Sequence, residues 1–299
     1  MRILVLGGTG YLGRHAAARL RALPGARILA AGRSATAEFG VDLAADPVER
    51  LAKTLAAAAP DAVVNCAGAT GGDPVTLAEA NARGPAVLCA ALREAAPTAR
   101  LVHLGSAAEY GPGVPGTPVT ESAPACPVTL YGATKLAGTA AITTSALDAV
   151  VLRVGNPVGP GAPVASLPGR LASLLRSAGR NPEAVLRLGD LSAHRDFVDV
   201  RDVAQAVALA VTEPGHLPPV LNIGGGTAVA IGELVDGLAR RAGFSGRLEE
   251  SAGGSARSAP VSWQCSDISA AARALGWRPA HTLDDALTAL WSATTETVP

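Results

Sequence analysis

The feature that most constrains this chain is a glycine-rich stretch near its amino terminus. The apolar run Ile3–Leu6 leads directly into Gly7-Gly8-Thr9-Gly10-Tyr11-Leu12-Gly13, and a helical segment follows. Glycines at this spacing permit a tight turn and let the backbone approach a pyrophosphate, while the helix N-terminus offers free N–H groups and a partial positive charge. Strand, glycine turn and helix together predict a dinucleotide-binding site, with a plain strand–helix turn as the alternative.

Short aliphatic runs alternate with longer alanine- and leucine-rich segments through residue 155. The short runs show no polar–apolar alternation, as expected for parallel strands buried on both faces. We therefore predict an α/β fold with a doubly wound parallel sheet of the Rossmann type. The predicted strands are Ile3–Leu6, Ile28–Ala31, Ala62–Asn65, Leu101–Leu104 and Ala149–Leu152, and the predicted helices are Tyr11–Leu23, Pro47–Ala58, Pro74–Ala95 and Leu130–Leu147.

The pattern changes after residue 155, where a loop rich in glycine and proline begins. We expect residues 1–155 to form the dinucleotide-binding domain and residues 156–299 to form mainly a smaller, discontinuous substrate-binding lobe. Segments near 195–212 and 219–224 are expected to return to the first domain. The predicted elements here are a strand at Val220–Ile223 and helices at Arg170–Ala178, Val200–Val211, Ile231–Ala242 and Leu283–Ala293.

Composition excludes several classes of protein. Of the 299 residues 48% are hydrophobic, which excludes a disordered chain. The 25 basic and 25 acidic residues cancel, so we expect no nucleic-acid partner. No stretch approaches about 18 consecutive apolar residues, and the first apolar run is too short for a signal peptide, so we expect a cytoplasmic protein without a membrane partner. Four scattered cysteines and five isolated histidines predict no metal site.

Tyr131 and Lys135 form the most informative pair of side chains. The chain has only three tyrosines and two lysines, and this tyrosine and lysine stand four residues apart in a predicted helix. Residues at that spacing share one helix face, and a nearby ammonium favours the phenolate and so lowers the pKa of a phenol. Such a pair suits proton transfer to or from a substrate oxygen. The alternative is an incidental pair on an amphipathic helix.

With these motifs the sequence resembles the extended short-chain dehydrogenase/reductases, the group of sugar-nucleotide epimerases, dehydratases and ketoreductases. Besides the glycine turn and the Tyr131–Lys135 pair, the resemblance rests on motifs that occur in the expected order. They are Asn65-Cys66-Ala67-Gly68, Asn81-Ala82-Arg83-Gly84, Leu104-Gly105-Ser106-Ala107-Ala108-Glu109-Tyr110-Gly111, Arg153-Val154-Gly155-Asn156-Pro157-Val158-Gly159-Pro160, Arg195-Asp196-Phe197-Val198-Asp199-Val200, Asn222-Ile223-Gly224-Gly225-Gly226 and Leu275-Gly276-Trp277.

The resemblance implies a catalytic triad of Ser106, Tyr131 and Lys135. In it Ser106 donates a hydrogen bond to the oxygen that Tyr131 protonates, and Lys135 also binds the ribose hydroxyls of the nicotinamide half of the cofactor. A serine that only caps the end of a strand is the alternative for Ser106. The resemblance further implies cofactor contacts from Asp42, Leu43, Cys66, Ala67, Gly68, Asn81 and Val158. For Asn81 the alternative is a residue that satisfies a neighbouring backbone group.

The end of the second predicted strand indicates which cofactor is used. NAD-binding chains normally place a carboxylate there for the adenosine ribose. This chain instead has Gly32-Arg33-Ser34, and an arginine suits a 2′-phosphate through a charge-assisted contact. We therefore expect Arg33 and Ser34 to bind NADP(H) in preference, with NAD(H) possible, and Arg14 to assist. An Arg33 that is merely exposed on a surface turn is the alternative.

A nucleotide sugar, carrying dTDP or UDP, is the substrate that the resemblance implies. Its expected contacts are Ser106, Ala107, Ala108, Asn156, Arg195 and Arg257. Arg195 has an alternative role as the partner of an acid such as Asp199. The resemblance also implies a homodimer through residues 74–95 and 130–147.

The resemblance places Ala107 and Ala108 where dehydratases of the group carry acids, and alanine transfers no proton, so we do not expect dehydration. The remaining prediction is NADPH-dependent reduction of a nucleotide-linked 4-keto(-6-deoxy) sugar by hydride transfer, with Tyr131 as proton donor. The alternatives are an NAD-dependent sugar-nucleotide 4-epimerase, an NADPH-dependent reductase of a non-sugar carbonyl, and a non-catalytic NADP-sensing regulator.

Overall fold

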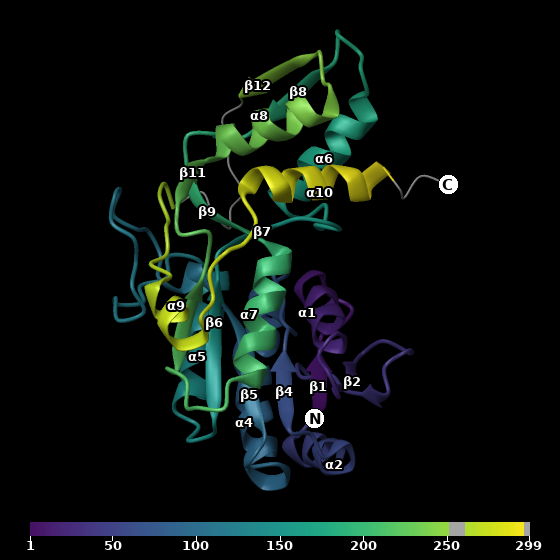
Figure 1. Ribbon diagram of the computed structural model, residues 1–299, viewed down its shortest axis with the longest axis vertical. Coiled ribbons are helices and arrows are strands. Elements are labelled where there is room, and N and C mark those ends of the chain that lie inside the picture. Colours follow the sequence, from purple (N-terminus) through teal and green to yellow (C-terminus); the bar gives the residue numbers. More distant parts are fainter. Residues whose placement is uncertain (251–260, 296–299) are drawn as a thin grey trace.

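The computed structural model describes residues 1–250 and 261–295 of the chain. Its larger part, in the lower half of Figure 1, is built on a seven-stranded sheet of order β10-β6-β5-β4-β1-β2-β3. All neighbouring strands in it run parallel. The strands are β1 (Arg2–Leu6), β2 (Arg27–Gly32), β3 (Phe39–Gly40), β4 (Ala62–Asn65), β5 (Arg100–Ser106), β6 (Ala149–Val154) and β10 (Val220–Ile223).

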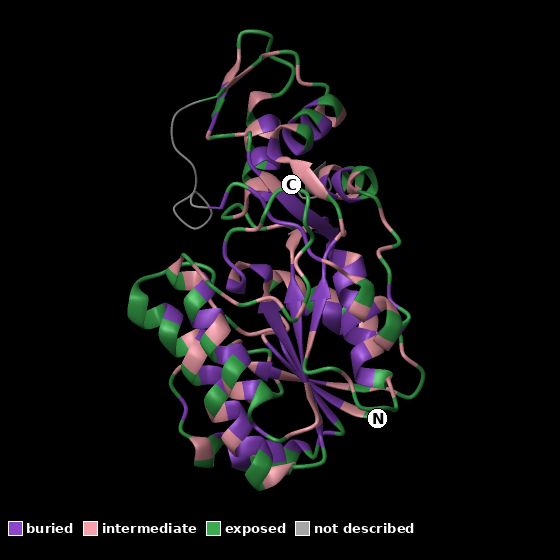
Figure 2. Ribbon diagram, turned by 90° about the vertical axis from the view of Figure 1, so that its left-hand side faces the viewer, coloured by how far each residue is buried: buried purple, intermediate pink, exposed green. Residues whose placement is uncertain are grey.

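Helices cover both faces of this sheet, as the absence of polar–apolar alternation predicts. In β1, Ile3 and Val5 pack into one core and Leu4 and Leu6 into the other. Figure 2 shows the central strands of this sheet as buried, with helices that are exposed on their outer sides. One face is covered by α1 (Tyr11–Arg21), α7 (Val200–Thr212) and α9 (Ser269–Leu275), and the other by α2 (Val48–Ala58), α4 (Gly84–Ala95) and α5 (Leu130–Thr143).

The prediction of a doubly wound parallel sheet is thus confirmed. Strand order reverses at β1, which lies between β2 and β4. In such sheets ligands bind in the crevice beyond the carboxyl ends of the strands, at the point of reversal. The glycine turn that follows β1 lies at that point.

The smaller lobe, in the upper half of Figure 1, is assembled from segments of the second half of the chain. A three-stranded sheet of order β11-β9-β7 lies next to the large sheet, and β12 pairs with β8 farther away. Apolar side chains from three helices form a separate core here. The elements are β7 (Asn156–Val158), α6 (Leu167–Ala178), β8 (Val185–Leu188), β9 (His194–Asp199), β11 (Ala228–Ala230), α8 (Ile231–Ala242), β12 (Arg247–Glu250) and α10 (Leu283–Thr295).

The continuous helix predicted over residues 74–95 is wrong in detail. The structure divides it into α3 (Pro74–Ala78), a π-helical turn η1 (Glu79–Arg83) and α4. Pro85 lacks an amide hydrogen, so the α-helical ladder cannot continue through it without interruption. π-Helical turns are often found at functional sites, and this one carries Asn81 and Arg83.

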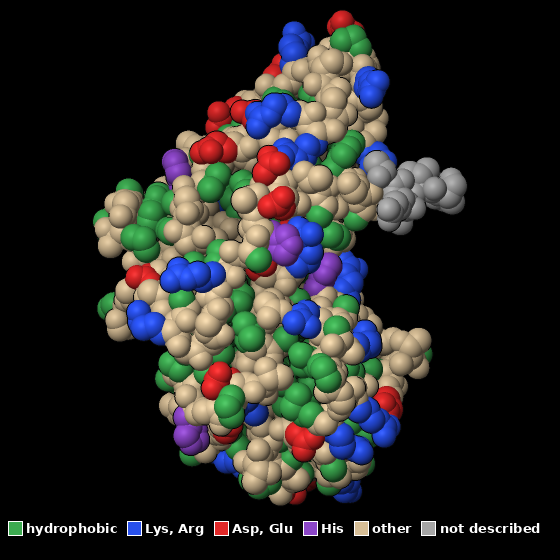
Figure 3. All heavy atoms as spheres, viewed as in Figure 1, with side chains coloured by type: hydrophobic (Ala, Val, Ile, Leu, Met, Phe, Trp, Pro, Cys, Tyr) green, Lys and Arg blue, Asp and Glu red, His purple; other side chains and the backbone are tan. Residues whose placement is uncertain are grey.

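The short strands β3, β7, β8, β9, β11 and β12 also escaped prediction, since several of them carry charged residues or prolines. The face in Figure 3 carries Lys, Arg, Asp and Glu side chains interspersed with one another, in keeping with zero net charge. Within the described residues, none of the helices combines the length and apolar character needed to cross a bilayer.

Candidate active site

The glycine turn between β1 and α1 is built for close approach. Gly7 has a φ of 72°, and a Cβ on it would lie 2.6 Å from the amide nitrogen of Ala67. The Gly10 amide donates to the Gly7 carbonyl at 3.0 Å and Gly10 is the N-cap residue of α1. No acidic residue occupies the first turn of this fully described helix. The turn therefore fits the pyrophosphate of a dinucleotide.

The loop that follows β4 faces this turn, and Asn81 holds it in place. The Asn81 amide accepts from the Ala69 amide at 2.9 Å and donates to the Ala69 carbonyl at 2.8 Å. It also donates to the hydroxyl of Thr134 at 3.3 Å, and the residue is 1% exposed. These contacts match the alternative role for Asn81: it orders the loop at Cys66, Ala67 and Gly68. We therefore do not retain it as a direct cofactor contact.

Arg83, from the same π-helical turn, orders the loop that includes Asp42 and Leu43. Its guanidinium donates to the carbonyls of Leu43 at 3.2 Å, Ala44 at 2.9 Å and Asp46 at 3.0 Å. In the sequence, Arg83 stood out only as part of the motif Asn81-Ala82-Arg83-Gly84, and its role in ordering the loop at Leu43 was not predicted.

Arg33 follows β2 at the adenosine end and is exposed. Among the described residues it has no ion-pair partner, so its guanidinium is available to a ligand. Ser34 lies beside it, with its hydroxyl 2.8 Å from that of Thr36. Arg14 points elsewhere: it donates to the Gly161 carbonyl and lies 5.7 Å from the centre of the Tyr11 ring. The expected assistance from Arg14 is therefore not supported.

Ser106 ends β5 and caps the short 3₁₀ turn η2 (Ala107–Glu109). Its hydroxyl accepts from the Ala108 amide at 3.2 Å, and its own amide donates to Glu109 Oε1 at 2.8 Å. Ser106 thus caps this turn, yet as an acceptor it keeps the O–H hydrogen for a substrate oxygen. Ala107 is 2% exposed and its carbonyl accepts from Gln264 at 2.7 Å, so we do not retain Ala107 as a substrate contact.

Helix α5 brings Tyr131 and Lys135 to the same place. Thr129 caps the helix, and Gly132 packs so closely on the Ala108 carbonyl that a Cβ there would overlap it. This contact brings the first turn of α5 onto the Ser106 turn. The Lys135 ammonium donates to the Leu104 carbonyl at 2.6 Å, two residues before Ser106 on β5. The predicted triad therefore gathers at the carboxyl end of β5.

Lys135 is 6% exposed, and its surroundings act on its charge in two directions. Burial lowers the pKa of its ammonium, and the nearby Glu109 carboxylate and Cys66 oppose that shift. The same burial raises the pKa of the Cys66 thiol to about 12, so the thiol stays protonated.

Sequence reasoning missed a buried charge pair beneath the triad. The Glu109 carboxylate is fully buried and accepts from Arg153 Nε at 2.7 Å and from the Thr139 hydroxyl at 2.8 Å. The Arg153 guanidinium lies 4.4 Å from the centre of the Tyr110 ring. Arg153 lies just beyond the predicted strand Ala149–Leu152, which the structure extends to Val154, so the sequence pattern did not indicate that this arginine is buried.

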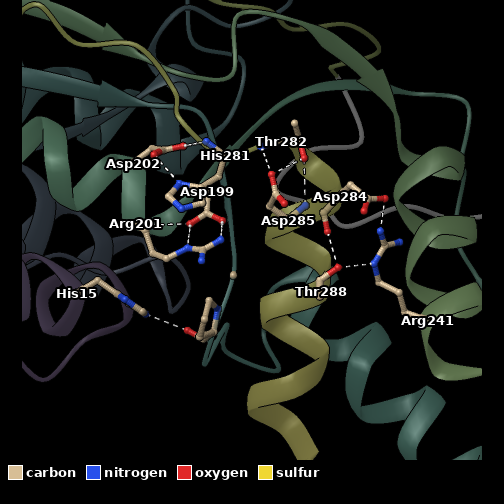
Figure 4. Close-up of polar contacts among 12 residues, drawn as sticks. His15, Asp199, Arg201, Asp202, Arg241, His281, Thr282, Asp284, Asp285 and Thr288 are labelled. Carbon is tan, nitrogen blue, oxygen red and sulfur yellow. Dashed lines mark hydrogen bonds and ion pairs between the residues drawn. The ribbon is translucent and has the colours of Figure 1, made fainter.

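Asn156 and Arg195, which were predicted to contact the substrate, lie where the smaller lobe meets the large sheet. The Asn156 amide donates to the Asp196 carbonyl at 3.4 Å, and Arg195, 5% exposed, donates to the His194 carbonyl at 2.8 Å. Asp199 pairs with Arg201 instead of Arg195. Its two oxygens accept at 2.9 and 2.6 Å, as Figure 4 shows.

Two further predicted residues do not join the site. Val158 has no exposed surface and packs in the core of the smaller lobe, so we do not retain it as a cofactor contact. Arg257 lies outside the described residues.

Contacts across the junction fix the lobe against the sheet. His15, on α1, lies 2.9 Å from the Pro160 carbonyl, and the Tyr11 hydroxyl donates to the Gly159 carbonyl at 3.4 Å. At the start of α7, Asp202 accepts from the His281 amide at 3.0 Å and lies 2.8 Å from its ring nitrogen. Figure 4 shows His15, Asp202 and His281 in this region. These contacts join α1 and α7 to the segments at residues 159–160 and at His281.

Comparison with known proteins agrees with this geometry. The model of the NAD dependent epimerase/dehydratase family matches residues 3–224. The chain belongs to this family. It is an NAD(P)-dependent enzyme of the extended short-chain dehydrogenase/reductase group, which confirms the resemblance drawn from its motifs.

Relatives of known activity extend over the whole chain. A Kitasatospora kifunensis protein described as dTDP-6-deoxy-L-talose 4-dehydrogenase (NAD(P)(+)) is 40% identical, over 98% of this chain and 95% of its own. RMD from Pseudomonas aeruginosa, solved with NADPH, superposes with a TM-score of 0.86 at 25% identity over 99% of each chain. The UDP-glucose 4-epimerase of Thermus thermophilus, solved with NAD, gives 0.85 at 26% identity over 100% of each chain.

Proposed function

We propose that this protein reduces the 4-keto group of a nucleotide-linked 6-deoxy sugar, with NADPH as the preferred cofactor. The observation that carries the proposal is the 40% identity, over nearly the full length of both chains, to a dTDP-6-deoxy-L-talose 4-dehydrogenase. A 4-dehydrogenase run in reverse is a 4-ketoreductase. The gathering of Ser106, Tyr131 and Lys135 at one end of β5 supports the same chemistry.

The cofactor is proposed to lie across the carboxyl ends of the strands, where the glycine turn fits its pyrophosphate. When bound, NADPH supplies the hydride. Arg33 and Ser34 would bind a 2′-phosphate, with Asp42 and Leu43 at the adenine. Lys135 would hold the ribose hydroxyls at the other end. Arg33 is exposed and has no ion-pair partner within residues 1–250 and 261–295, and the residues next to it at the end of β2, Gly32 and Ser34, are not acidic; this supports the preference for NADPH.

Tyr131 is proposed as the general acid. As negative charge develops on the carbonyl oxygen, Tyr131 donates its phenolic proton to that oxygen. Ser106 keeps its O–H hydrogen for the same oxygen, because its oxygen accepts from the Ala108 amide. The Lys135 ammonium stabilises the phenolate that remains on Tyr131.

The sugar nucleotide is proposed to bind between the sheet and the smaller lobe. Asn156 and Arg195 are the contacts retained within the described residues, with Ala108 beside the sugar, and Arg257 stays a prediction. An arginine suits the diphosphate because its planar guanidinium can donate two hydrogen bonds to phosphate oxygens at once. No acid replaces Ala107 or Ala108 next to Ser106, which supports reduction over dehydration.

A homodimer is also proposed. The outer face of α5 is small and apolar, with Ala133, Ala137 and Ala140 exposed and Leu130 46% exposed. Pairing of this face with its copy would bury it. A charged side chain introduced by Ala137→Glu should convert the dimer into a monomer in sedimentation experiments.

A 4-epimerase is the second candidate. The structural similarity to the UDP-glucose 4-epimerase of Thermus thermophilus favours it, since that likeness covers the entire chain. An epimerase returns the hydride to the same carbon and so consumes no cofactor. Reductase and epimerase therefore differ in a quantity that is easily measured.

The test is to incubate the enzyme with NADPH and a panel of dTDP- and UDP-linked 4-keto-6-deoxyhexoses and to follow NADPH absorbance. We expect oxidation of one equivalent of NADPH for each sugar, and a product two mass units heavier by mass spectrometry. Interconversion of 4-hydroxy epimers without net NADPH consumption would assign the enzyme as an epimerase. Turnover of small ketones alone would assign it as a non-sugar reductase.

A further inference from the structure

Glu109 lies at the centre of a set of contacts that joins three elements of the active site. Its Oε1 accepts from the Ser106 amide at 2.8 Å. Its Oε2 accepts from the Thr139 hydroxyl at 2.8 Å on α5 and from Arg153 Nε at 2.7 Å on β6. The residue has no exposed surface, so no solvent screens its charge. One carboxylate therefore links the turn that carries Ser106 to the helix that carries Tyr131 and Lys135.

Lys135 and Thr139 stand one helical turn apart and face the same carboxylate. Residues four apart share a face of an α-helix, and the Thr139 hydroxyl already bonds to Glu109. The Lys135 ammonium bonds to the Leu104 carbonyl, and a Cβ on the adjacent Gly105 would lie 2.8 Å from Glu109 Oε1. The Lys135 ammonium and the Glu109 carboxylate thus lie beside consecutive residues of β5, Leu104 and Gly105.

The other titratable groups around Lys135 do not offset a buried positive charge. On β5, burial keeps the pKa of His103 well below its usual value, with a smaller effect of Lys135 in the same direction, so the imidazole is neutral. Cys66 stays a thiol, and Tyr131 on the same helix is the proton donor of the proposed reaction. Arg153 adds positive charge behind Glu109. Among the described groups that act on the charge of Lys135, Glu109 is the carboxylate.

We propose that Glu109 is a positioning residue for the reaction, and that its buried negative charge keeps the Lys135 ammonium protonated. Without it, a lysine enclosed by neutral groups and by Arg153 would release its proton readily. A neutral Lys135 would no longer stabilise the Tyr131 phenolate. The inference rests on the role proposed for Lys135 in the reaction, yet the charge of Lys135 can be measured without any substrate.

The chain contains only two lysines, Lys53 and Lys135, which makes a direct titration feasible. Protein labelled with [ε-¹³C]lysine gives two side-chain resonances in NMR spectra, and Lys53→Arg assigns them. Lys53 is exposed and serves as an internal reference. Titration from neutral pH upward yields the midpoint of Lys135 in the free protein, whether or not the proposed sugar is the substrate.

Glu109→Gln keeps the shape of the side chain and an acceptor for the Ser106 amide but removes the charge. We expect it to lower the Lys135 midpoint by about 1 pH unit or more and to leave Lys53 unchanged. In turnover, the alkaline limb of the kcat/KM profile, which reports the free enzyme, should also move to lower pH. Thr139→Val is the matched control: it removes a hydrogen bond to the same carboxylate and keeps the charge, so the Lys135 midpoint should stay in place.

An unchanged Lys135 midpoint in folded Glu109→Gln protein would overturn the proposal, and so would an equal shift in Thr139→Val. If Glu109→Gln does not fold, Arg153→Gln decides. Loss of the neighbouring cation should raise the Lys135 midpoint, and a midpoint that does not rise would count against the proposal. If no sugar is reduced but Lys135 titrates as expected, the proposed reaction is rejected and the proposed coupling between Glu109 and Lys135 stands.

Discussion

Gly13, in the first turn of α1, packs directly against the carbonyl of Gly7, so that a Cβ on Gly13 would overlap that oxygen. The substitution Gly13→Ala must therefore displace the turn that fits the cofactor pyrophosphate. Overpacking of this kind costs about 1–3 kcal/mol. We expect the NADPH dissociation constant to rise about ten-fold or more, as measured by fluorescence of the reduced nicotinamide.

Gly71→Ala is the matched control for this change. Nothing lies within 4 Å of a Cβ built on Gly71, and its backbone lies outside the left-handed region. It should bind NADPH as the parent protein does. Unchanged NADPH binding by Gly13→Ala would show that the turn accommodates the methyl group, contrary to this prediction.

Arg33→Ala tests the choice of cofactor. A hydrogen bond to a charged group contributes about 1.5–3 kcal/mol, so the NADPH dissociation constant should rise roughly ten- to a hundred-fold. That of NADH should change little, because NADH lacks the 2′-phosphate. Arg21→Ala removes an exposed arginine at the last residue of α1, the end away from the glycine turn, and should alter neither dissociation constant. Equal losses for NADPH and NADH in Arg33→Ala would contradict the proposed phosphate contact.

Tyr131→Phe tests the proton donor. The substitution keeps the ring and removes only the hydroxyl, so we expect NADPH binding and thermal stability to persist while kcat falls roughly a hundred-fold or more. Stopped-flow absorbance of NADPH under single-turnover conditions separates the chemical step from product release. Full activity in this variant would mean that another group supplies the proton.

The large sheet could be predicted because its determinants are local. Ile3–Leu6 carries apolar residues on both faces, and the glycine turn after it is typical of the carboxyl end of a parallel strand. Tyr131 and Lys135 were found because a helix fixes their spacing. Their convergence with Ser106 depends on the contact of Gly132 with Ala108, which the spacing of residues does not disclose.

Other parts of the site depend on contacts between segments far apart in the chain. Glu109 and Arg153 are 44 residues apart, and either one alone resembles an ordinary surface residue. Arg14 lies next to the glycine turn in sequence, but its guanidinium donates a hydrogen bond to the Gly161 carbonyl, far away in the chain. Pairings of this kind follow from the folded arrangement of the strands and not from the pattern of any one segment.

Asp196, on β9, illustrates a buried acid whose protonation affects stability. Its Oδ1 accepts from the amides of Gly225 at 2.6 Å and Gly226 at 3.0 Å, and its Oδ2 accepts from the Ser266 amide at 3.0 Å. Burial nevertheless raises its pKa from the usual 3.8 to about 6, against the opposing effect of these hydrogen bonds. The folded protein thus holds this proton more tightly than the unfolded chain does.

Asp196→Asn removes the titration, so its comparison with the parent protein isolates the contribution of this group. The contribution is fully present below the unfolded pKa of about 3.8 and is lost as the pH rises through about 6. At about 1.4 kcal/mol per pH unit, the stability of the parent protein relative to the variant should decline by about 3 kcal/mol across this window. Urea unfolding followed by circular dichroism at several pH values measures it.

Asp190→Asn is the control of opposite sign: hydrogen bonds from Ser192 lower the pKa of this exposed carboxyl, so its contribution is lost as the pH falls. A difference between parent and Asp196→Asn that is flat, or that grows with pH, would mean that folding does not raise the pKa of Asp196.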